Sequence, residues 1–257
     1  MVEQLRAGIA EGQLVLHYQP KLALATGEVD GVEALVRWQH PTRGLLFPDA
    51  FIDLAESAGL MSRLTSAVVD MALAQCRRWA DDGGLLTVSV NVSPSNLVDE
   101  EFPDEVATVL RRHDLPPTAL VLEVTESILM EDRERAVRVL SRLRDAGVGV
   151  SIDDYGTGYS NLAYLAALPV TELKLDRVFI GAMTGSSRAA SIVTSTLQLA
   201  HALDLTLVAE GAEDQETVDA LAGLGCDLVQ GYHLSRPLPA DQLWAWLAQR
   251  AARTPIS

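Results

Sequence analysis

Two kinds of hydrophobic pattern alternate along the chain. Short runs of apolar and β-branched residues predict strands, and longer stretches with apolar residues every three or four positions predict helices. The predicted strands are 14–18, 29–38, 86–91, 120–124, 148–152, 172–175, 205–209 and 227–230. The predicted helices are 67–79, 106–112, 136–144, 192–201 and 217–224. Strands that alternate with helices through most of the chain favour a closed α/β barrel over an open sheet.

Turn signals refine this arrangement. Gly147 and Gly225 each follow a predicted helix and indicate glycine C-caps. The first two strands are joined by Ala-Thr-Gly-Glu at 25–28, which predicts a hairpin and therefore one strand antiparallel to its neighbours. Because neither a composition break nor a Gly/Ser-rich linker divides the chain, residues 1–257 are predicted to form one domain with a core of about 5–250 and a frayed tail at 251–257.

Composition narrows the classes of function. The 257 residues are 48% hydrophobic and 21% charged, which suits one large core. The formal net charge of −15 argues against a nucleic-acid polymer as partner, because phosphate-tracking proteins need basic surface. Cys76 and Cys226 stand 150 residues apart, so neither a disulfide framework nor a zinc site is expected. With no secretory signal pattern and no apolar run near the roughly 18 residues that span a bilayer, we expect a cytoplasmic domain without membrane contact.

Polar residues end successive predicted strands. In a β/α barrel the carboxyl ends of the parallel strands form one rim, where active sites lie. Because side chains alternate along a strand, Glu33 and Arg37 of the second strand share one face and can also point into this rim. The strand-end residues are Asn91, Glu123, Asp153, Asp154, Lys174, Asp176, Glu210 and Gln230.

These residue types indicate metal chemistry. Carboxylate and amide oxygens select hard cations such as Mg²⁺ or Mn²⁺. The adjacent Asp153 and Asp154 can place one carboxylate between two ions, and two ions about 3.5–4 Å apart clamp a phosphoryl displacement. Arg37 and Lys174 would neutralise phosphate charge. The pattern predicts phosphodiester hydrolysis or another metal-dependent hydrolase or lyase reaction, although any single strand-end carboxylate is more often a helix N-cap or a turn residue.

The chain resembles the EAL domain family from about residue 5 to residue 237. This resemblance implies a modified TIM (β/α)8 barrel with the first strand antiparallel to the others. It also implies hydrolysis of cyclic di-GMP to linear pGpG by a water activated by two Mg²⁺ or Mn²⁺ ions. The matching segments are Tyr18-Gln19-Pro20, Glu33-Ala34-Leu35-Val36-Arg37-Trp38, Asn91-Val92-Ser93, Glu123-Val124-Thr125-Glu126-Ser127, Asp153-Asp154-Tyr155-Gly156-Thr157-Gly158-Tyr159-Ser160, Lys174-Leu175-Asp176, Val208-Ala209-Glu210-Gly211 and Gln230-Gly231-Tyr232.

The resemblance also implies a role for each site residue. One ion would be held by Glu33, Asn91, Glu123 and Asp153, and the second by Asp153 and Asp154 with Glu210 nearby as ligand or water-positioning group. Lys174 would orient or help deprotonate the attacking water, supported by Asp176. Substrate contacts would come from Gln19, Arg37 and Gln230. Glu126 and Glu213 would act behind these residues, Glu126 by anchoring the loop after Asp154.

Two residues depart from the usual family pattern. Tyr155 replaces the usual Phe, and Ala212 replaces the commoner Val of Gly-Val-Glu. Neither stands at a position with an implied metal ligand. We therefore expect an active enzyme.

Other functions remain open from the sequence. The chain could be a catalytically silent receptor for cyclic di-GMP or a dimerising signalling module. A barrel aldolase or isomerase would have to use Lys174, whose acidic neighbours argue against the lowered pKa that a Schiff base needs. The resemblance further implies a homodimer through the loop after Asp154, and a sensor or GGDEF domain elsewhere in a longer parent protein.

Overall fold

Eight strands close into a barrel in the computed structural model, which describes residues 1–126, 132–156 and 165–251. Around the barrel the strands follow the order β1, β9, β8, β7, β6, β5, β4, β2, and β2 pairs with β1 to close it. Strand β1 is antiparallel to both neighbours, whereas the others run parallel. The predicted barrel with one reversed strand is confirmed. The strands are β1 (Leu14–Ala23), β2 (Val29–His40), β4 (Thr87–Asn91), β5 (Leu120–Thr125), β6 (Gly149–Tyr155), β7 (Glu172–Leu175), β8 (Thr206–Glu210) and β9 (Leu228–Gln230).

The reversed strand follows from the predicted hairpin. Strands β1 and β2 pair from Leu14 opposite Trp38 to Leu22 opposite Val29. Gly27 in the turn has φ +71, a left-handed conformation that glycine adopts without steric cost. On its other side β1 pairs with β9 at Leu22 and Ala23.

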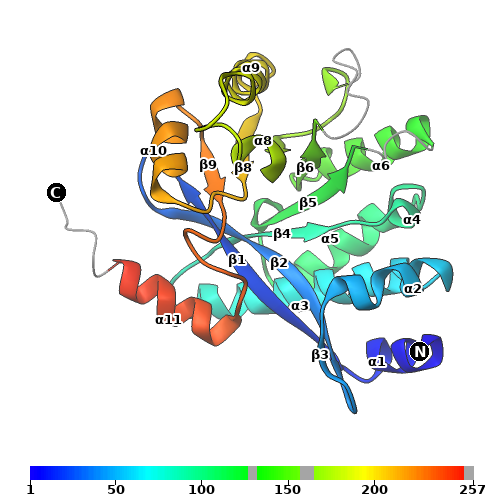
Figure 1. Cartoon of the computed structure of the whole chain (residues 1–257). Helices are drawn as coiled ribbons and strands as arrows, with labels where there is room; N and C mark the ends of the chain where they lie inside the picture. Colours follow the sequence, from blue (N-terminus) through cyan, green and yellow to red (C-terminus); the bar gives the residue numbers. More distant parts are fainter. Residues whose placement is uncertain (127–131, 157–164, 252–257) are drawn as a thin grey trace.

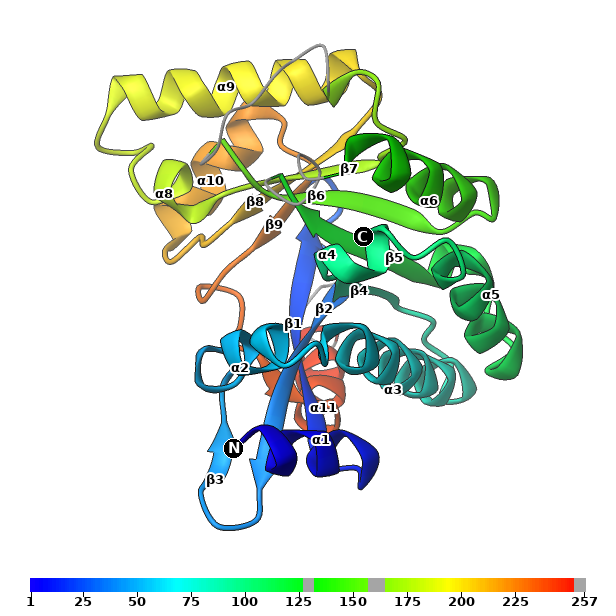
Figure 2. The same cartoon turned by 90° about the vertical axis from the view of Figure 1, so that its right-hand side faces the viewer.

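Helices surround the barrel, as Figures 1 and 2 show from two directions. Helix α6 (Arg133–Asp145) begins where the Asp132 side chain accepts a hydrogen bond from the Arg135 backbone N–H. Its buried residues recur at helical spacing and pack on the barrel. Gly147 and Gly225 have φ +92 and +77, which confirms both predicted glycine ends. The other helices are α1 (Val2–Ala10), α2 (Ile52–Ser57), α3 (Met61–Asp81), α4 (Pro94–Leu97), α5 (Phe102–Arg112), α8 (Arg177–Ile180), α9 (Ser187–Ala202), α10 (Gln215–Leu224) and α11 (Ala240–Ala251).

Several elements were absent from the sequence prediction. Helices α1 and α11 flank the long β1–β2 hairpin, and α3 begins six residues before the predicted start. Tertiary contacts hold these segments. Helix α1 packs so closely on the Trp38 side chain that a Cβ atom at Gly8 would lie 2.6 Å from Trp38 Nε1, so only glycine fits there. The rings of Trp79 and Trp244 stack with centroids 6.4 Å apart, which ties α11 to α3. The remaining short elements are β3 (Gly44–Leu46), β10 (Leu238–Pro239) and the 3₁₀ turns η1 (Pro48–Ala50) and η2 (Pro117–Ala119).

Two predicted features fall largely outside the described residues. Most of the loop proposed for dimer contact (157–160) and nearly all of the frayed tail lie outside the described residues. Across the described ranges, every helix is too short or too polar to cross a bilayer.

Candidate active site

The predicted strand-end residues meet at one mouth of the barrel because the strands are in register there. Backbone pairing sets Gln19 opposite Glu33. It likewise sets Asn91 beside Glu123 and Glu210 beside Gln230. With side chains on alternate faces, these residues and Lys174 point into the barrel.

Lys174 lies at the centre of four carboxylates. Its Nζ is 2.7 Å from Glu210 Oε1, 2.8 Å from Glu123 Oε2 and 3.1 Å from Asp153 Oδ1. Glu33 Oε2 is 3.7 Å away. The side chains of Lys174 and Glu123 are completely buried. One cation therefore faces several anions out of contact with bulk water, where charge interactions are strong.

Side-chain amides hold Glu33 from both sides. Asn91 Nδ2 donates to Glu33 Oε1 at 2.9 Å, and Gln230 Nε2 donates to Glu33 Oε2 at 2.7 Å. Gln230 Nε2 also lies 3.1 Å from Gln19 Oε1, and Gln19 Nε2 donates to the Ser235 carbonyl at 3.1 Å. Side chains from β1, β4 and β9 thus position one carboxylate of β2, and this network brings two residues predicted as metal ligands together with two predicted as substrate contacts.

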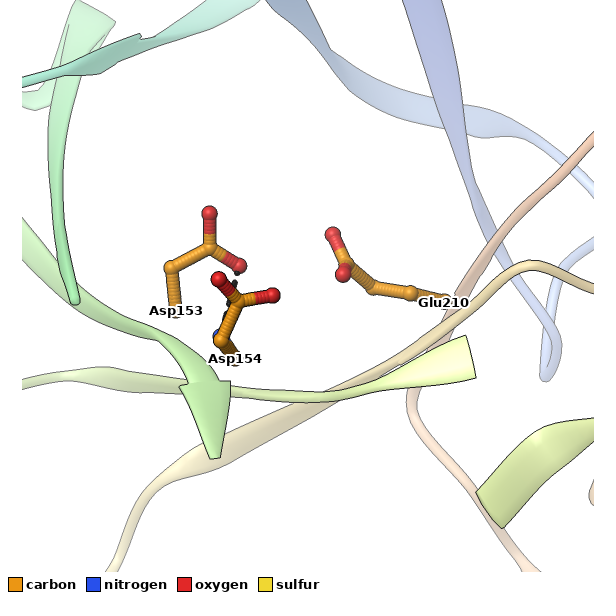
Figure 3. A group of neighbouring side chains, drawn as sticks. All are labelled: Asp153, Asp154 and Glu210. Atoms are coloured by element: carbon orange, nitrogen blue, oxygen red, sulfur yellow. Dashed lines mark hydrogen bonds between the residues drawn. The ribbon is translucent and has the colours of Figure 1, made fainter. Parts of the chain in front are cut away.

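A second acidic group opens toward solvent. Asp153, Asp154 and Glu210 each offer an oxygen, and these oxygens all lie within 4.8 Å of one another (Figure 3). The backbone N–H of Asp154 donates to Asp153 Oδ1 at 2.9 Å. Asp154 has φ +56, a left-handed conformation that costs energy for a non-glycine residue although Asp tolerates it better than most.

Burial and charge shift the pKa values of the mouth residues in different directions. Burial raises the pKa of Glu123 well above its usual range, and it raises the pKa of Glu210 to about 7. Burial also acts to raise the pKa of Glu33, but the charge of Lys174 and the amide hydrogen bonds outweigh it and lower this pKa. For Lys174, burial alone would lower the pKa, yet the surrounding carboxylates raise it well above the ordinary value. Lys174 therefore stays protonated, and four carboxyl groups share its single positive charge.

This donor set fits hard divalent cations. Within the described residues, Glu123 Oε1 is buried without a hydrogen-bond partner, although an unpaired buried carboxylate oxygen is costly. The remaining candidate ligands are carboxylate oxygens and the Asn91 amide, the ligand types that Mg²⁺ and Mn²⁺ prefer. Asp153 belongs both to the group around Lys174 and to the more open group with Asp154.

The other predicted residues lie around this centre. Arg37 is largely buried, and its guanidinium donates to the Val36 carbonyl at 2.8 Å and lies 4.9 Å from the Phe47 ring centroid. Asp176 accepts from the Val178 backbone N–H at 2.8 Å and caps α8. Glu213 lines the same cleft as the metal-type residues. Glu126 directly follows β5, which ends at Thr125, and precedes a segment outside the described residues.

Two adjoining hollows mark the mouth. The acidic cleft has a volume of about 380 Å³, with Asp153, Asp154 and Glu210 in its wall. A largely apolar hollow of about 420 Å³ lies between β2, β4 and the start of α3, lined by Met61 and Val92 among others. Leu35 lines both hollows.

The sequence analysis missed three polar residues beneath the mouth. Lys21 Nζ is 2.8 Å from Ser89 Oγ and 3.2 Å from each carboxylate oxygen of Glu172. Strand alternation could have revealed them in the sequence. Lys21, Ser89 and Glu172 each lie two positions from a predicted site residue on the same strand, so their side chains point to the same face of the strand.

Comparisons with known proteins identify the family of the chain. The family model described as the EAL domain matches residues 2–237. The bifunctional diguanylate cyclase/cyclic di-GMP phosphodiesterase MucR of Pseudomonas aeruginosa is 44% identical over 249 residues, which cover 96% of this chain and 36% of MucR. The cyclic di-GMP phosphodiesterase NbdA of the same organism is 46% identical over 248 residues, 96% of this chain and 32% of NbdA. The chain thus spans about a third of the length of these curated relatives.

Solved structures show the same fold. A MucR phosphodiesterase structure in complex with c-di-GMP superposes with a TM-score of 0.88 at 44% identity, covering 94% of this chain and 98% of that chain. The EAL domain of Mycobacterium smegmatis DcpA matches with a TM-score of 0.79 at 35% identity, covering 95% of this chain and 99% of that chain. The match extends over the reversed strand and the mouth residues alike, and the chain belongs to the EAL domain family.

Proposed function

We propose that this domain hydrolyses cyclic di-GMP to linear pGpG with the help of two divalent ions, Mg²⁺ or Mn²⁺. The observation that carries the proposal is the complete ring of oxygen donors around Lys174 at the mouth of an EAL-family barrel. The names of MucR and NbdA and the c-di-GMP bound in the MucR structure support the substrate.

Each ion would have its own set of ligands. Glu33, Asn91, Glu123 and Asp153 would hold the more buried ion, for which the unpaired Glu123 oxygen is a ready ligand. Asp154 and Glu210, with Asp153 shared, would hold the more open one. Such ions, when bound, lower the pKa of water and stabilise charge on a phosphoryl group.

The protein's own residues would guide the attack on phosphorus. Lys174 stays an ammonium because the surrounding carboxylates raise its pKa, so it would donate a hydrogen bond that orients the water. Glu210, with an oxygen 2.7 Å from Lys174 Nζ, would position the attacking water beside that ammonium and accept its proton. The water oxygen would bond to phosphorus as the bond to the ribose 3′ oxygen breaks, and that oxygen would leave with a proton.

Substrate binding would use the rim of the mouth. Gln19 and Gln230 bring amide groups to the carboxylate ring, and the Arg37 guanidinium adds a planar cation suited to a phosphate oxygen. The apolar hollow beside the acidic cleft has room for a purine base. Asp176 would support the site by fixing the start of α8, with Glu126 and Glu213 behind the substrate-facing residues.

The cysteines and the lengths of the relatives bear on the cellular compartment and the parent protein. We infer a cytoplasmic domain because both Cys76 and Cys226 are buried as free thiols, which suits a reducing compartment. The greater length of the relatives supports a parent protein with further domains, such as a sensor or a GGDEF domain. A homodimer through the loop after Asp154 stays a proposal from family resemblance.

The decisive experiment is incubation of the chain with cyclic di-GMP and either Mg²⁺ or Mn²⁺, with chromatographic detection of pGpG. We expect pGpG with each ion and none after chelation by EDTA. Tight binding of cyclic di-GMP without product under both ions would overturn the proposal and favour a receptor.

A further inference from the structure

Below the mouth, the barrel interior holds a second buried cation. Lys21 of β1 is 1% exposed, and its ammonium has three acceptors: Ser89 Oγ at 2.8 Å and both Glu172 carboxylate oxygens at 3.2 Å. Ser89 is completely buried and Glu172 nearly so. All three ammonium hydrogens can thus be satisfied at once. We call Lys21, Ser89 and Glu172 the Lys21 triad.

Each triad member lies one layer beneath a residue of the mouth. Side chains two positions apart on a strand point the same way, so triad and mouth residues come in vertical pairs. The pairs are Lys21 with Gln19 on β1, Ser89 with Asn91 on β4, and Glu172 with Lys174 on β7. In the barrel order, one strand separates β1 from β4, while two strands separate β7 from each of them. The triad therefore joins three well-spaced strands through the interior.

Stability alone does not account for a buried ion pair. Barrel interiors are usually filled by branched apolar side chains, and replacing a buried ion pair by apolar residues of similar volume is often neutral or stabilising. Burial lowers the pKa of Lys21, but the charges of Glu172 and Glu123 outweigh this and raise it, so Lys21 is an ammonium. The pair thus provides fixed, directional contacts that an apolar layer lacks.

We propose that the Lys21 triad is an internal brace that sets the spacing of the mouth residues, which makes Lys21 a positioning residue for the reaction. Strand β1 pairs with β2 from Leu14 to Leu22, but on its other side it pairs with β10 at His17 and Tyr18 and with β9 at Leu22 and Ala23, so Gln19 and Lys21 lie between these two short pairings. A shift of β1 would move Gln19, whose amide oxygen accepts from Gln230. Gln230 in turn holds Glu33, so the shift would reach a proposed metal ligand. The catalytic part of this inference rests on the proposed function.

The test compares Mn²⁺ affinity and pGpG formation in variants of the whole chain. Ser89→Ala removes one acceptor with little change in volume. Lys21→Met/Glu172→Met removes the ion pair without leaving either charge buried alone. Ser151→Ala is the matched control, because this serine is equally buried in the barrel but its Oγ has no hydrogen-bond partner within the described residues.

We expect both triad variants to bind Mn²⁺ at least ~10-fold more weakly in calorimetry, as is common when groups behind metal ligands are removed. The rate of pGpG formation should also fall in both triad variants. Ser151→Ala should match the wild type in Mn²⁺ affinity and in pGpG formation. The thermal midpoint of the double variant should stay near the wild-type value, which separates positioning from stability.

Wild-type Mn²⁺ affinity in both triad variants would overturn the inference. If the double variant does not fold, Ser89→Ala decides alone. A wild-type chain that binds Mn²⁺ but yields no pGpG would refute the proposed function, and the Mn²⁺ affinities would still test the brace.

Discussion

Replacing Lys174 by Met should expose the excess negative charge of the mouth. The substitution keeps most of the side-chain volume and removes the only lysine that contacts this carboxylate cluster in the described part of the chain. Glu33, Glu123, Asp153 and Glu210 then lose their common cation. With the ammonium gone, the charge of Lys21 still acts on Glu33 and Glu123 from a distance while it bonds to Ser89 and Glu172, so most of the mutual repulsion remains.

The expected cost follows from this burial. Removing one partner of a buried ion pair typically costs about 3–5 kcal/mol, because the remaining charge stays buried without compensation. Since ~1 kcal/mol corresponds to 2–4 °C for a protein of this size, the thermal midpoint in EDTA should fall by about 6–20 °C. At lower pH, protonation of the carboxylates removes part of their repulsion. The difference in thermal midpoint between Lys174→Met and the wild type should therefore be larger at pH 8 than at pH 6.

Thermal unfolding with and without Mn²⁺ distinguishes this reasoning from a simple packing defect. Bound Mn²⁺ supplies the missing positive charge, so it should restore most of the midpoint but not the turnover, which lacks the orienting ammonium. A loss of about 10²–10³-fold in kcat is expected when a hydrogen-bond donor that orients the reacting groups is removed. Arg188→Met, which removes an exposed cation outside the mouth, is the control and should unfold like the wild type. An unchanged midpoint for Lys174→Met in EDTA at pH 8, or a deficit that Mn²⁺ leaves untouched, would refute the electrostatic account.

Three further predictions concern the same site. Glu33→Ala should abolish pGpG formation because it removes the carboxylate that Asn91 and Gln230 hold, and an active variant would refute the ligand assignment. Glu210 has a pKa of about 7 when folded and metal-free, so Mn²⁺ affinity measured by calorimetry should rise from pH 6 to pH 8 as its proton is lost. Over the same range the metal-free thermal midpoint should fall, because the folded state binds more protons than the unfolded state; a flat pH profile would contradict the raised pKa. Arg37→Met should raise KM by about 10-fold or more with a smaller change in kcat, the pattern of a lost binding contact in steady-state kinetics; an unchanged KM would remove Arg37 from the substrate site.

The barrel and much of its mouth could be predicted because strand periodicity is local. Alternation along a strand places Glu33 and Arg37 on one face whatever the rest of the chain does. A turn such as that containing Gly27 makes a hairpin from neighbouring residues alone. Helices α1 and α11 escaped prediction because their positions depend on distant partners, as the stacking of Trp244 on Trp79 illustrates.

The sequence by itself determined which residues end the strands, that one strand would be reversed, and that the mouth would carry oxygen donors for hard cations. Only the tertiary structure decided how these donors share charge: that Lys174 faces four carboxylates, that the pKa of Glu210 rises to about 7, and that Lys21 lies buried one layer below. The physical reason is that alternation and turn chemistry act between neighbours in the chain. Burial and Coulomb interactions depend instead on distances between strands far apart in sequence, which exist only once the barrel has closed.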